Sequence, residues 1–373
     1  MKLAVLGAGM VGRAIALDLA TTHEITSFDQ NAENLSILSR RDSRIRTRKE
    51  DLTRYDSYPE WLSEFDLVLT AVPGFMGYRT LEAVIKAGKS VADISFFPED
   101  ALQLGALAKE KGVTVITDVG VAPGMSNLIL GRYNEEMRVT HFECYVGGLP
   151  ANPQPPYFYK APFSPIDVIE EYIRPARLKE KGKIVEKPAL TERELIEFDE
   201  VGTLEAFNTD GLRSLLFTLP HIPDMKEKTM RFPGHIDLIL SLKEAGFFDT
   251  KKIVVQGKEI SPLEFTSRML IDDWKLGEEE EEFTVMRVIV EGEKEGTKKR
   301  IEYNLLDRYD PVSRLSSMAR TTGYTCTAAA QLILQGLFVE KGVFPPEFVG
   351  KSSVCFEKIM DYLEQRGVRW KRT

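Results

Sequence analysis

The sequence has little cysteine and no long apolar run. Only three of its 373 residues are cysteines, Cys144, Cys326 and Cys355, and none forms a CxxC pair. An odd number of scattered cysteines favours buried thiols in a reducing compartment over a disulfide framework. No segment reaches the ~18 apolar residues of a spanning helix, and the apolar start MKLAVLGAG is too short for a secretory signal. We therefore expect a cytoplasmic protein with no membrane partner.

Positive charge and metal-binding motifs are scarce as well. Lys and Arg number 49 against 57 Asp and Glu, a formal net charge of −8, which argues against nucleic acid or an anionic membrane as a partner. The acidic run Glu278–Glu282 predicts a solvated loop, with a cation site as the alternative. The chain contains no HExxH, no Cys/His ligand set and no GxSxG, so we predict neither a metal site nor acyl transfer.

The chain does have a soluble composition and a clear alternation of elements in its first third. It is 43% hydrophobic and 28% charged, and its length suggests two domains. Apolar strands are expected at 2–6, 24–29, 66–73, 90–95 and 113–118, with helices at 10–20, 76–86 and 99–111 between them. Uniformly apolar strands separated by helices predict a doubly wound α/β domain with a parallel sheet.

The pattern changes after about residue 125. A strand at 141–148 and a proline-rich stretch at 149–165 precede a helix, and two β-branched segments around EKEGT predict an antiparallel hairpin. Helical patterns return at 327–338 and 353–367. This order predicts a second, α+β domain, followed by a tail of the kind that often packs back on the first domain.

The clearest motif is GAGMVG, which follows the first strand and opens the first helix. In such a motif Gly7 permits a tight turn, Gly9 lets a pyrophosphate approach the backbone, and Gly12 lets helix and strand pack closely. The amides of Met10 and Val11 would face the phosphates at the helix N-terminus. The alternative is a glycine turn without a ligand.

An acidic residue stands where a dinucleotide site needs one. Asp29 ends the second strand, 17 residues beyond Gly12, and can accept both ribose hydroxyls of adenosine. Gln30 follows, and no adjacent arginine could receive a 2′-phosphate. The sequence therefore predicts NAD rather than NADP.

Further cofactor contacts are expected where later strands end. Asp51 and Leu52 would lie beside the adenine, with a helix cap as the alternative. Ala71, Val72 and Pro73 would border the middle of the cofactor, or form only a turn. Asp93 and Ser95 would face the crevice near the nicotinamide, although Asp93 could equally cap a helix.

Several motifs in order resemble one family. "GAGMVG", "AVPGFMG", "DVGVAPGMSN", "YFYKAPFSPIDVIEEYIRPA", "TDGLRSLL" and "RFPGH" are similar to the saccharopine dehydrogenase-like family, which contains saccharopine reductase, carboxynorspermidine dehydrogenase and lysine 6-dehydrogenase. The resemblance implies a Rossmann domain of residues 1–124 and 316–373. It also implies an inserted α+β domain of residues 125–315 that carries substrate contacts and the surface of a homodimer or larger homo-oligomer.

Two positions depart from the saccharopine reductase pattern. Ala122 stands where those proteins typically have an aspartate, and Val146 stands where they have a cysteine. Both departures resemble the lysine 6-dehydrogenase branch, which implies NAD-dependent oxidative deamination of L-lysine at its side-chain amine to the semialdehyde. The alternatives are a glutamate-forming saccharopine dehydrogenase, a carboxynorspermidine dehydrogenase, or a nucleotide-binding scaffold without turnover.

The expected substrate residues come from the inserted domain and the tail. Arg231 in RFPGH is the first choice to bind the substrate carboxylate and Arg213 in TDGLRS the second, each with a structural salt bridge as the alternative. His235 is the expected proton carrier or a structural histidine. Lys160 is a candidate base or a surface lysine, and Tyr159 is expected beside it.

Asp93 completes the predicted catalytic set with His235 and Lys160. In ARTTGY, Arg320, Thr322 and Gly323 are expected either to touch cofactor or substrate, or to serve capping and packing.

Overall fold

The computed structural model describes residues 1–163 and 165–373, and the chain divides into two compact units. Unit 1 comprises 1–139, 290–300 and 318–371, and unit 2 comprises 140–289, 301–317 and 372–373. Ser164, in the proline-rich stretch, lies outside the described residues. No helix in the described ranges is long and apolar enough to cross a membrane.

Unit 1 is built on a seven-stranded parallel sheet, as the sequence predicted. The strand order is β17-β6-β5-β4-β1-β2-β3, so the order reverses between β1 and β4. The strand bounds are β1 Lys2–Leu6, β2 Glu24–Asp29, β3 Arg46–Lys49, β4 Leu67–Thr70, β5 Val91–Asp93, β6 Thr114–Ile116 and β17 Gly342–Phe344. Ligands of such sheets bind beyond the carboxyl ends of the strands, where the order reverses.

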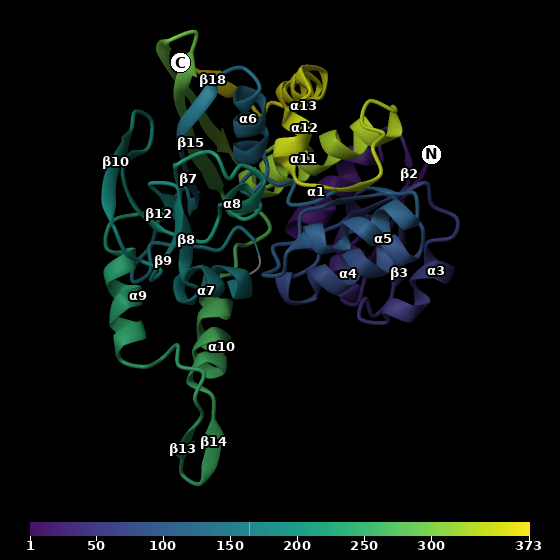
Figure 1. Ribbon diagram of the computed structural model, residues 1–373. Coiled ribbons are helices and arrows are strands. Elements are labelled where there is room, and N and C mark those ends of the chain that lie inside the picture. Colours follow the sequence, from purple (N-terminus) through teal and green to yellow (C-terminus); the bar gives the residue numbers. More distant parts are fainter. Residues whose placement is uncertain (164) are drawn as a thin grey trace. The chain divides into compact units, whose positions relative to one another are not determined.

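Helices lie between the strands from β1 to β6 along the chain, and further helices of unit 1 follow β6, precede β17 and follow β17 (Figure 1). Their bounds are α1 Met10–Leu19, α2 Ala32–Arg41, α3 Tyr58–Trp61, α4 Gly74–Lys86, α5 Gly105–Glu110, α6 Met125–Asn134, α11 Ser317–Leu334, α12 Pro346–Gly350 and α13 Ser353–Gln365, with single 3₁₀ turns at Tyr55–Ser57 and Ala101–Leu104. The predicted helix at 99–111 is thus a 3₁₀ turn followed by α5. The tail helix begins ten residues earlier than predicted.

Helix α6 belongs to unit 1, whereas the sequence analysis assigned 125–134 to the inserted domain. A Cβ on Gly131 would lie 2.1 Å from the Glu347 carbonyl oxygen, and one on Gly350 would lie 2.2 Å from that of Leu128. Glycine at these two places lets α6 and α12 pack backbone to backbone. The buried Asn127 side chain also donates to Glu347 Oε2 (3.1 Å). The boundary between the units therefore falls after Val139 rather than after residue 124.

The second sheet has nine strands in mixed directions. Its main order is β10-β11-β12-β7-β15-β16-β18, and β8 pairs with β12 and β9. The bounds are β7 Arg138–Pro150, β8 Ala176–Glu180, β9 Lys183–Lys187, β10 Glu194–Phe198, β11 Gly202–Asn208, β12 Asp224–Arg231, β15 Glu282–Lys294, β16 Thr297–Arg308 and β18 Trp370–Arg372. The predicted hairpin is confirmed as β15–β16, with Glu295 and Gly296 at positive φ in its turn.

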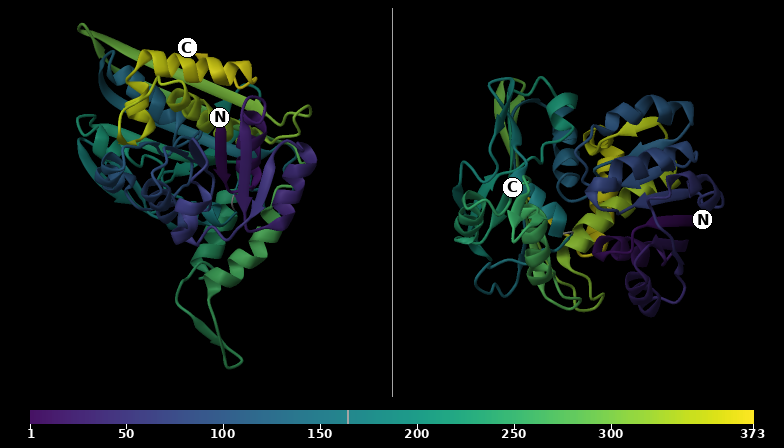
Figure 2. Two further views of the ribbon diagram at one scale, coloured as in Figure 1. Left: turned by 90° about the vertical axis from the view of Figure 1, so that its right-hand side faces the viewer. Right: turned by 90° about the horizontal axis from the view of Figure 1, so that it is seen from below.

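Unit 2 adds four helices and a small ribbon. The helices are α7 Pro165–Ile173, α8 Leu215–Thr218, α9 His235–Glu244 and α10 Pro262–Trp274, and β13 Ile253–Val255 pairs only with β14 Lys258–Ile260. Figures 1 and 2 show this ribbon extending beyond α9 and α10. The acidic run is not wholly a loop, because Glu282 is a buried residue of β15.

Candidate functional site

The three glycines of the turn at the end of β1 have two kinds of surroundings. Gly7 and Gly12 pack against backbone atoms, whereas Gly9 faces open space. A Cβ on Gly7, whose φ is 104°, would lie 2.3 Å from the Ala71 carbonyl oxygen, and one on Gly12 would lie 2.0 Å from that of Gly7. A Cβ on Gly9 would meet no atom within 4 Å. The amides of Met10 and Val11 follow as the first residues of α1. This open backbone at a helix N-terminus fits a pyrophosphate.

Asp29 is held beside this turn. Its Oδ2 accepts the Ala8 amide (2.7 Å), and its Oδ1 accepts the Asn31 amide (2.7 Å). The carboxylate is half-buried. Its Oδ2 also accepts a long hydrogen bond from Asn34 Nδ2 (3.5 Å), whereas Oδ1 keeps a second lone pair for a ribose hydroxyl. Gln30 is exposed between Asp29 and Asn31, the N-cap of α2. The predicted adjacency of Asp29 and the glycine-rich turn is therefore present in unit 1.

The remaining predicted cofactor residues serve visible structural roles. Asp51 Oδ1 accepts both the amide and the hydroxyl of Thr53 (3.0 and 2.7 Å), and these bonds lower its pKa. This is a local turn and not the expected helix cap, because the N-cap of the following 3₁₀ turn is Arg54. Leu52 packs in the core of unit 1. Ala71 contacts the glycine-rich turn through its carbonyl, Val72 is buried, and Pro73 is the N-cap of α4.

Asp93 ties three strand ends together. Its Oδ1 accepts the Thr70 hydroxyl (2.5 Å) and the Ser95 amide (3.1 Å), and its Oδ2 accepts the Thr117 hydroxyl (3.1 Å). Burial raises its pKa to about 6. The geometry therefore favours a structural clamp over the predicted catalytic role. Thr70 and Thr117 were missed, because both lie inside the predicted strands 66–73 and 113–118, whereas the observed strands β4 and β6 end at Thr70 and just before Thr117.

The turn after β6 in unit 1 contacts Thr322 of α11. A Cβ on Gly120 would lie 3.1 Å from Thr322 Cγ2, so α11 contacts the turn that holds Ala122. Gly124, at φ 141°, closes the turn against Gly120. By contrast, Arg320 donates to the Arg366 carbonyl (3.0 Å), and Gly323 packs on Ala14 of α1. Those two follow the packing alternative.

In unit 2, the predicted His235 and Arg231 meet in one hydrogen-bonded chain. Arg231 Nε donates to Tyr172 Oη (3.0 Å), and Tyr172 Oη lies 2.9 Å from His235 Nε2. His235 Nδ1 lies 2.8 Å from the Tyr157 carbonyl oxygen. Because a carbonyl only accepts, Nδ1 carries the proton, and Nε2 accepts from Tyr172. Both ring nitrogens are therefore occupied.

The surroundings of His235 keep it neutral. Burial, followed by the charge of Arg231, lowers its pKa to about 3. The rings of Tyr159, Tyr172 and Trp274 surround it, with centroids 5.1 to 5.9 Å away. Of the two expected roles, proton carrier or structural histidine, these contacts favour the structural one, because the ring holds Tyr172, which in turn accepts from Arg231. Nothing in the spacing of the sequence could have revealed Tyr172 as its partner.

Arg231 binds a carboxylate that belongs to the protein. Its Nη2 donates to Glu171 Oε2 (2.9 Å), and its guanidinium lies 4.4 Å from the centre of the Tyr159 ring. Burial raises the pKa of Glu171, and the ion pair opposes that shift. The structural salt bridge, which was the alternative for Arg231, is thus the arrangement observed.

The other predicted substrate residues spread over unit 2. Lys160 Nζ donates to the Asp273 carbonyl (2.7 Å), which is a structural contact. Arg213 is buried at a positive φ of 50°. Val146 is buried on β7, opposite Thr229 of β12.

Tyr159 Oη and Trp274 Nε1 are buried without a hydrogen-bond partner among the residues that the structure describes. Their rings lie 5.5 Å apart, centre to centre, in the aromatic cluster around His235. Buried polar atoms of this kind normally have a partner. The pair therefore marks a place in unit 2 where a water molecule or a polar ligand atom fits.

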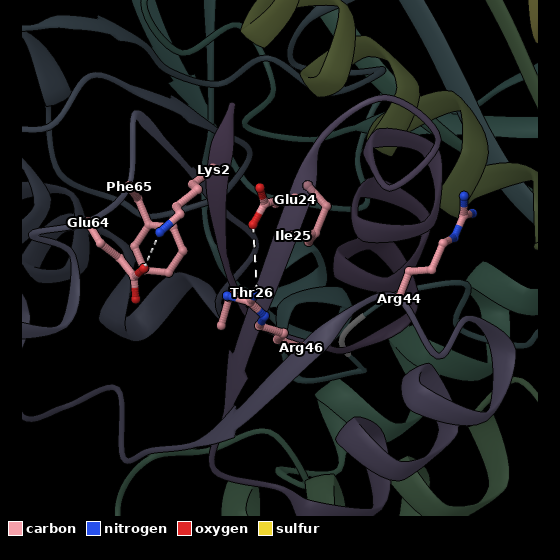
Figure 3. Close-up of a pocket in the computed structure, with 8 residues that line it drawn as sticks. All are labelled: Lys2, Glu24, Ile25, Thr26, Arg44, Arg46, Glu64 and Phe65. Atoms are coloured by element: carbon pink, nitrogen blue, oxygen red, sulfur yellow. Dashed lines mark hydrogen bonds and ion pairs between the residues drawn. The ribbon is translucent and has the colours of Figure 1, made fainter.

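A depression in unit 1 lies at the amino ends of the strands, on the side of the sheet away from the glycine-rich turn. Lys2, Glu24–Thr26 and Arg46 line it at the amino ends of β1–β3, with Arg44, Glu64 and Phe65 (Figure 3). The pairs Lys2–Glu64 (2.9 Å) and Glu24–Arg46 (3.7 Å) are exposed and contribute little. Parallel sheets bind ligands at the carboxyl edge, so this depression is not the nucleotide site.

Both units match one family. Residues 3–116 match the family model described as saccharopine dehydrogenase NADP binding domain, and residues 120–368 match that described as saccharopine dehydrogenase C-terminal domain. The chain belongs to the saccharopine dehydrogenase family. It is therefore an NAD(P)-dependent oxidoreductase of the class that acts on a CH–NH donor.

Curated relatives have low sequence identity to this chain, but they align over most of its length. The glutamate-forming, NADP-dependent saccharopine dehydrogenase of Schizosaccharomyces pombe is 24% identical over 385 residues, covering 83% of this chain and 84% of that protein. Alpha-aminoadipic semialdehyde synthase of Arabidopsis thaliana is 24% identical over 296 residues, covering 69% of this chain but only 28% of that much longer protein.

Solved structures share the fold. Glutamate-forming saccharopine dehydrogenase of Saccharomyces cerevisiae superposes with a TM-score of 0.80 at 19% identity, covering 100% of this chain and 99% of that one. Homospermidine synthase of Legionella pneumophila, in complex with NAD, reaches 0.69 at 11% identity, covering 100% and 91%. The predicted Rossmann domain with a second α+β domain is confirmed. A nicotinamide dinucleotide is supported as the cofactor.

Proposed function

We propose that this protein is a saccharopine dehydrogenase of the glutamate-forming type, which oxidises the secondary amine of a lysine-derived amino acid. The observation that carries the proposal is the glycine-rich turn, where Gly9 leaves open space at the N-terminus of α1 while Gly7 and Gly12 are filled by backbone. The extent of the match to a glutamate-forming relative, over 83% of the chain, supports the substrate class.

The reaction removes a hydride, which carries two electrons, from the carbon beside the substrate nitrogen. A nicotinamide dinucleotide held at the glycine-rich turn would supply the acceptor for this hydride. The resulting imine is hydrolysed by one water molecule to an aldehyde and an amino acid. The substrate amine must first lose its proton, which costs about 4–5 kcal/mol at pH 7 for an amine with a pKa near 10.4.

NAD is the cofactor that the Asp29 site supports. A half-buried carboxylate, fixed by two backbone amides at 2.7 Å, accepts ribose hydroxyls and repels a 2′-phosphate. The family description and the fungal relatives name NADP, so the two cofactors have to be compared directly.

A second candidate is oxidative deamination of L-lysine itself. Ala122 and Val146 are apolar where a saccharopine site resembling the reductases would carry an acid and a thiol. An apolar residue lowers the pKa of a neighbouring amine by desolvation, whether the amine is primary or secondary, so it is the resemblance of these two positions to the lysine 6-dehydrogenase branch that favours this candidate. Both candidates oxidise a carbon–nitrogen bond, so both agree with the class of reaction of this family.

The test is the absorbance at 340 nm with NAD or NADP, each with saccharopine or L-lysine. Reduction with saccharopine and NAD is the expected result. Reduction with lysine alone would transfer the assignment to the second candidate. Binding of NADH without turnover of any amine would instead identify a scaffold.

The cellular setting is part of the proposal. The three cysteines are buried thiols, in keeping with the expected reducing cytoplasm, and the family resemblance implies a homodimer or a larger homo-oligomer.

A further inference from the structure

The carboxyl ends of β2 and β3 in unit 1 bring an arginine close to Asp29. No arginine adjoins Asp29 in the sequence. In the sheet, however, β3 lies parallel to β2, and its Arg48 is in register with Phe28, the residue before Asp29. Lys49 is in register with Asp29 itself, and the Glu50 amide donates to the Asp29 carbonyl (3.1 Å). Because neighbouring strands lie about 4.8 Å apart, these side chains begin one strand away from the expected ribose-binding carboxylate.

Two contacts hold the Arg48 side chain. Its Nη2 donates to Glu50 Oε1 (3.0 Å), and its guanidinium carbon lies 5.1 Å from the centre of the Phe28 ring. The Arg48 side chain is 40% exposed and that of Glu50 is 22% exposed, so solvent and small solutes can reach the guanidinium. An ion pair with this exposure contributes little to the free energy of unfolding. Removing its charge should therefore leave the fold intact.

The chemistry of this ion pair bears on the choice between NAD and NADP. The two cofactors differ by a phosphate on the adenosine 2′-oxygen, and an arginine near the acidic position accommodates this phosphate in NADP-binding proteins. Arg48 has the positive charge and the planar donor geometry that such a phosphate needs. The Glu50 carboxylate, however, accepts from this guanidinium and offsets its charge. A 2′-phosphate would therefore meet two carboxylates, those of Asp29 and Glu50.

Lys49 is the other cation at these strand ends. Its side chain is exposed, and a lysine ammonium is a strongly hydrated point charge on a flexible stem. The guanidinium of Arg48 is planar and already lies against an aromatic ring, so it loses less conformational freedom when it pairs with an anion. Arg48 is thus the better phosphate partner of the two.

We propose that Glu50 is a specificity-determining residue of the cofactor site, which binds Arg48 and so keeps its guanidinium from a 2′-phosphate. This inference rests on the proposed NAD site at Asp29 and adds a second residue to it. Without Glu50, a free guanidinium one strand away would attract the phosphate that Asp29 repels. The two acids therefore act against the same phosphate from neighbouring strands.

The test measures the dissociation constants of NADH and NADPH by fluorescence titration of the full-length chain, with no amine present. Glu50→Gln keeps the size of the side chain and removes its charge. This variant should lower the ratio of the NADPH to the NADH dissociation constant at least about fivefold, because the freed guanidinium can pair with the 2′-phosphate. Its urea midpoint should stay close to that of the parent, since the ion pair is exposed.

The double variant Glu50→Gln with Arg48→Gln separates specific pairing from a general change of charge. It has the net charge of the parent but lacks the guanidinium, so the ratio should return to within about twofold of the parent value. The matched control is Glu24→Gln, because Glu24 and Arg46 form an exposed pair (3.7 Å) at the amino ends of the same two strands (Figure 3). This control changes the net charge as Glu50→Gln does, and it should leave the ratio unchanged.

An unchanged ratio in Glu50→Gln would overturn the proposal, whichever cofactor the parent prefers. So would a lowered ratio that survives Arg48→Gln, since the phosphate would then lie on Lys49 or respond to charge alone. The titrations contain no amine, so they do not depend on the substrate assignment. A parent that binds NADPH more tightly than NADH would contradict the proposed NAD site, which is a result distinct from the absence of a shift in Glu50→Gln.

Discussion

Replacing Gly9 by alanine should remove cofactor binding while leaving the fold intact. The backbone at Gly9 has φ −66° and ψ −173°, which alanine adopts freely, and its Cβ would meet nothing within 4 Å. Alanine is a poorer N-cap than glycine by about 0.5–1 kcal/mol, and it gains about 0.4–1 kcal/mol by restricting the unfolded chain. The net change in the free energy of unfolding should be below about 1 kcal/mol.

The matched variants are Gly7→Ala and Gly12→Ala. Their Cβ atoms would lie 2.3 and 2.0 Å from backbone oxygens, and overpacking of this kind costs about 1–3 kcal/mol. Gly7, at φ 104°, adds about 1–2 kcal/mol of backbone strain. These two variants should therefore lose stability as well as binding.

The assay pairs a urea unfolding midpoint with a titration of NADH fluorescence. Gly9→Ala should weaken binding by at least about tenfold, or about 1.4 kcal/mol, because the methyl group occupies the approach of the pyrophosphate. Unchanged NADH affinity in Gly9→Ala would refute the assignment of this turn. So would a Gly9→Ala variant as unstable as Gly7→Ala.

Three further outcomes are expected. Asp29→Ser should shift the ratio of kcat/KM for NAD over that for NADP towards NADP by about tenfold, and an unchanged ratio in the 340 nm assay would contradict the role of the carboxylate. The pKa of His235 is near 3 in the folded protein and about 6.5 in the unfolded chain. Protonation of the unfolded chain therefore lowers the free energy of unfolding as the pH falls from 6.5 towards 3. Urea titrations should show the parent losing about 2–3 kcal/mol more than His235→Gln between pH 7 and pH 4.5, and parallel curves would show that the ring is not neutral. Gly131→Ala should lower the free energy of unfolding by about 1–3 kcal/mol, since its Cβ would lie 2.1 Å from the Glu347 carbonyl oxygen, and an unchanged melting temperature would argue against the tight helix pair.

The parallel sheet could be predicted because its signals are local. Residues 2–6 are an apolar run of strand length, residues 24–29 have Ile25 and Phe28 within a segment of similar length, and the glycines that follow the first run fix the turn. The assignment of α6 could not be predicted, because it depends on Gly131 meeting Glu347, more than two hundred residues away. Strand β7 runs from Arg138 to Pro150, longer than the predicted 141–148. Its ends are extended because they pair with neighbouring strands of the sheet, which the local sequence does not show.

The residue types of the site were easier to predict than their roles. Asp29 follows from its place at the end of a strand, and its contacts agree with that expectation. Asp93, Arg231 and His235 stand out by type, but each is saturated by partners that no spacing reveals: two threonines, Glu171 and Tyr172. A charged side chain in a motif is as often buried for packing as presented to a ligand, and only the tertiary contacts distinguish the two.

The position of β17 determines when the first unit can be completed during synthesis. This strand pairs with β6 through Gly342↔Thr114 and Phe344↔Ile116, although the two segments are translated far apart. Until residue 344 has left the ribosome, the outer side of β6 has unpaired amides and carbonyls, which are a template for non-native strand pairing. The growing chain therefore carries an unfinished sheet while residues 140–289 and 301–317 of unit 2 are made, and an unpaired strand edge of this kind makes a folding intermediate prone to aggregation.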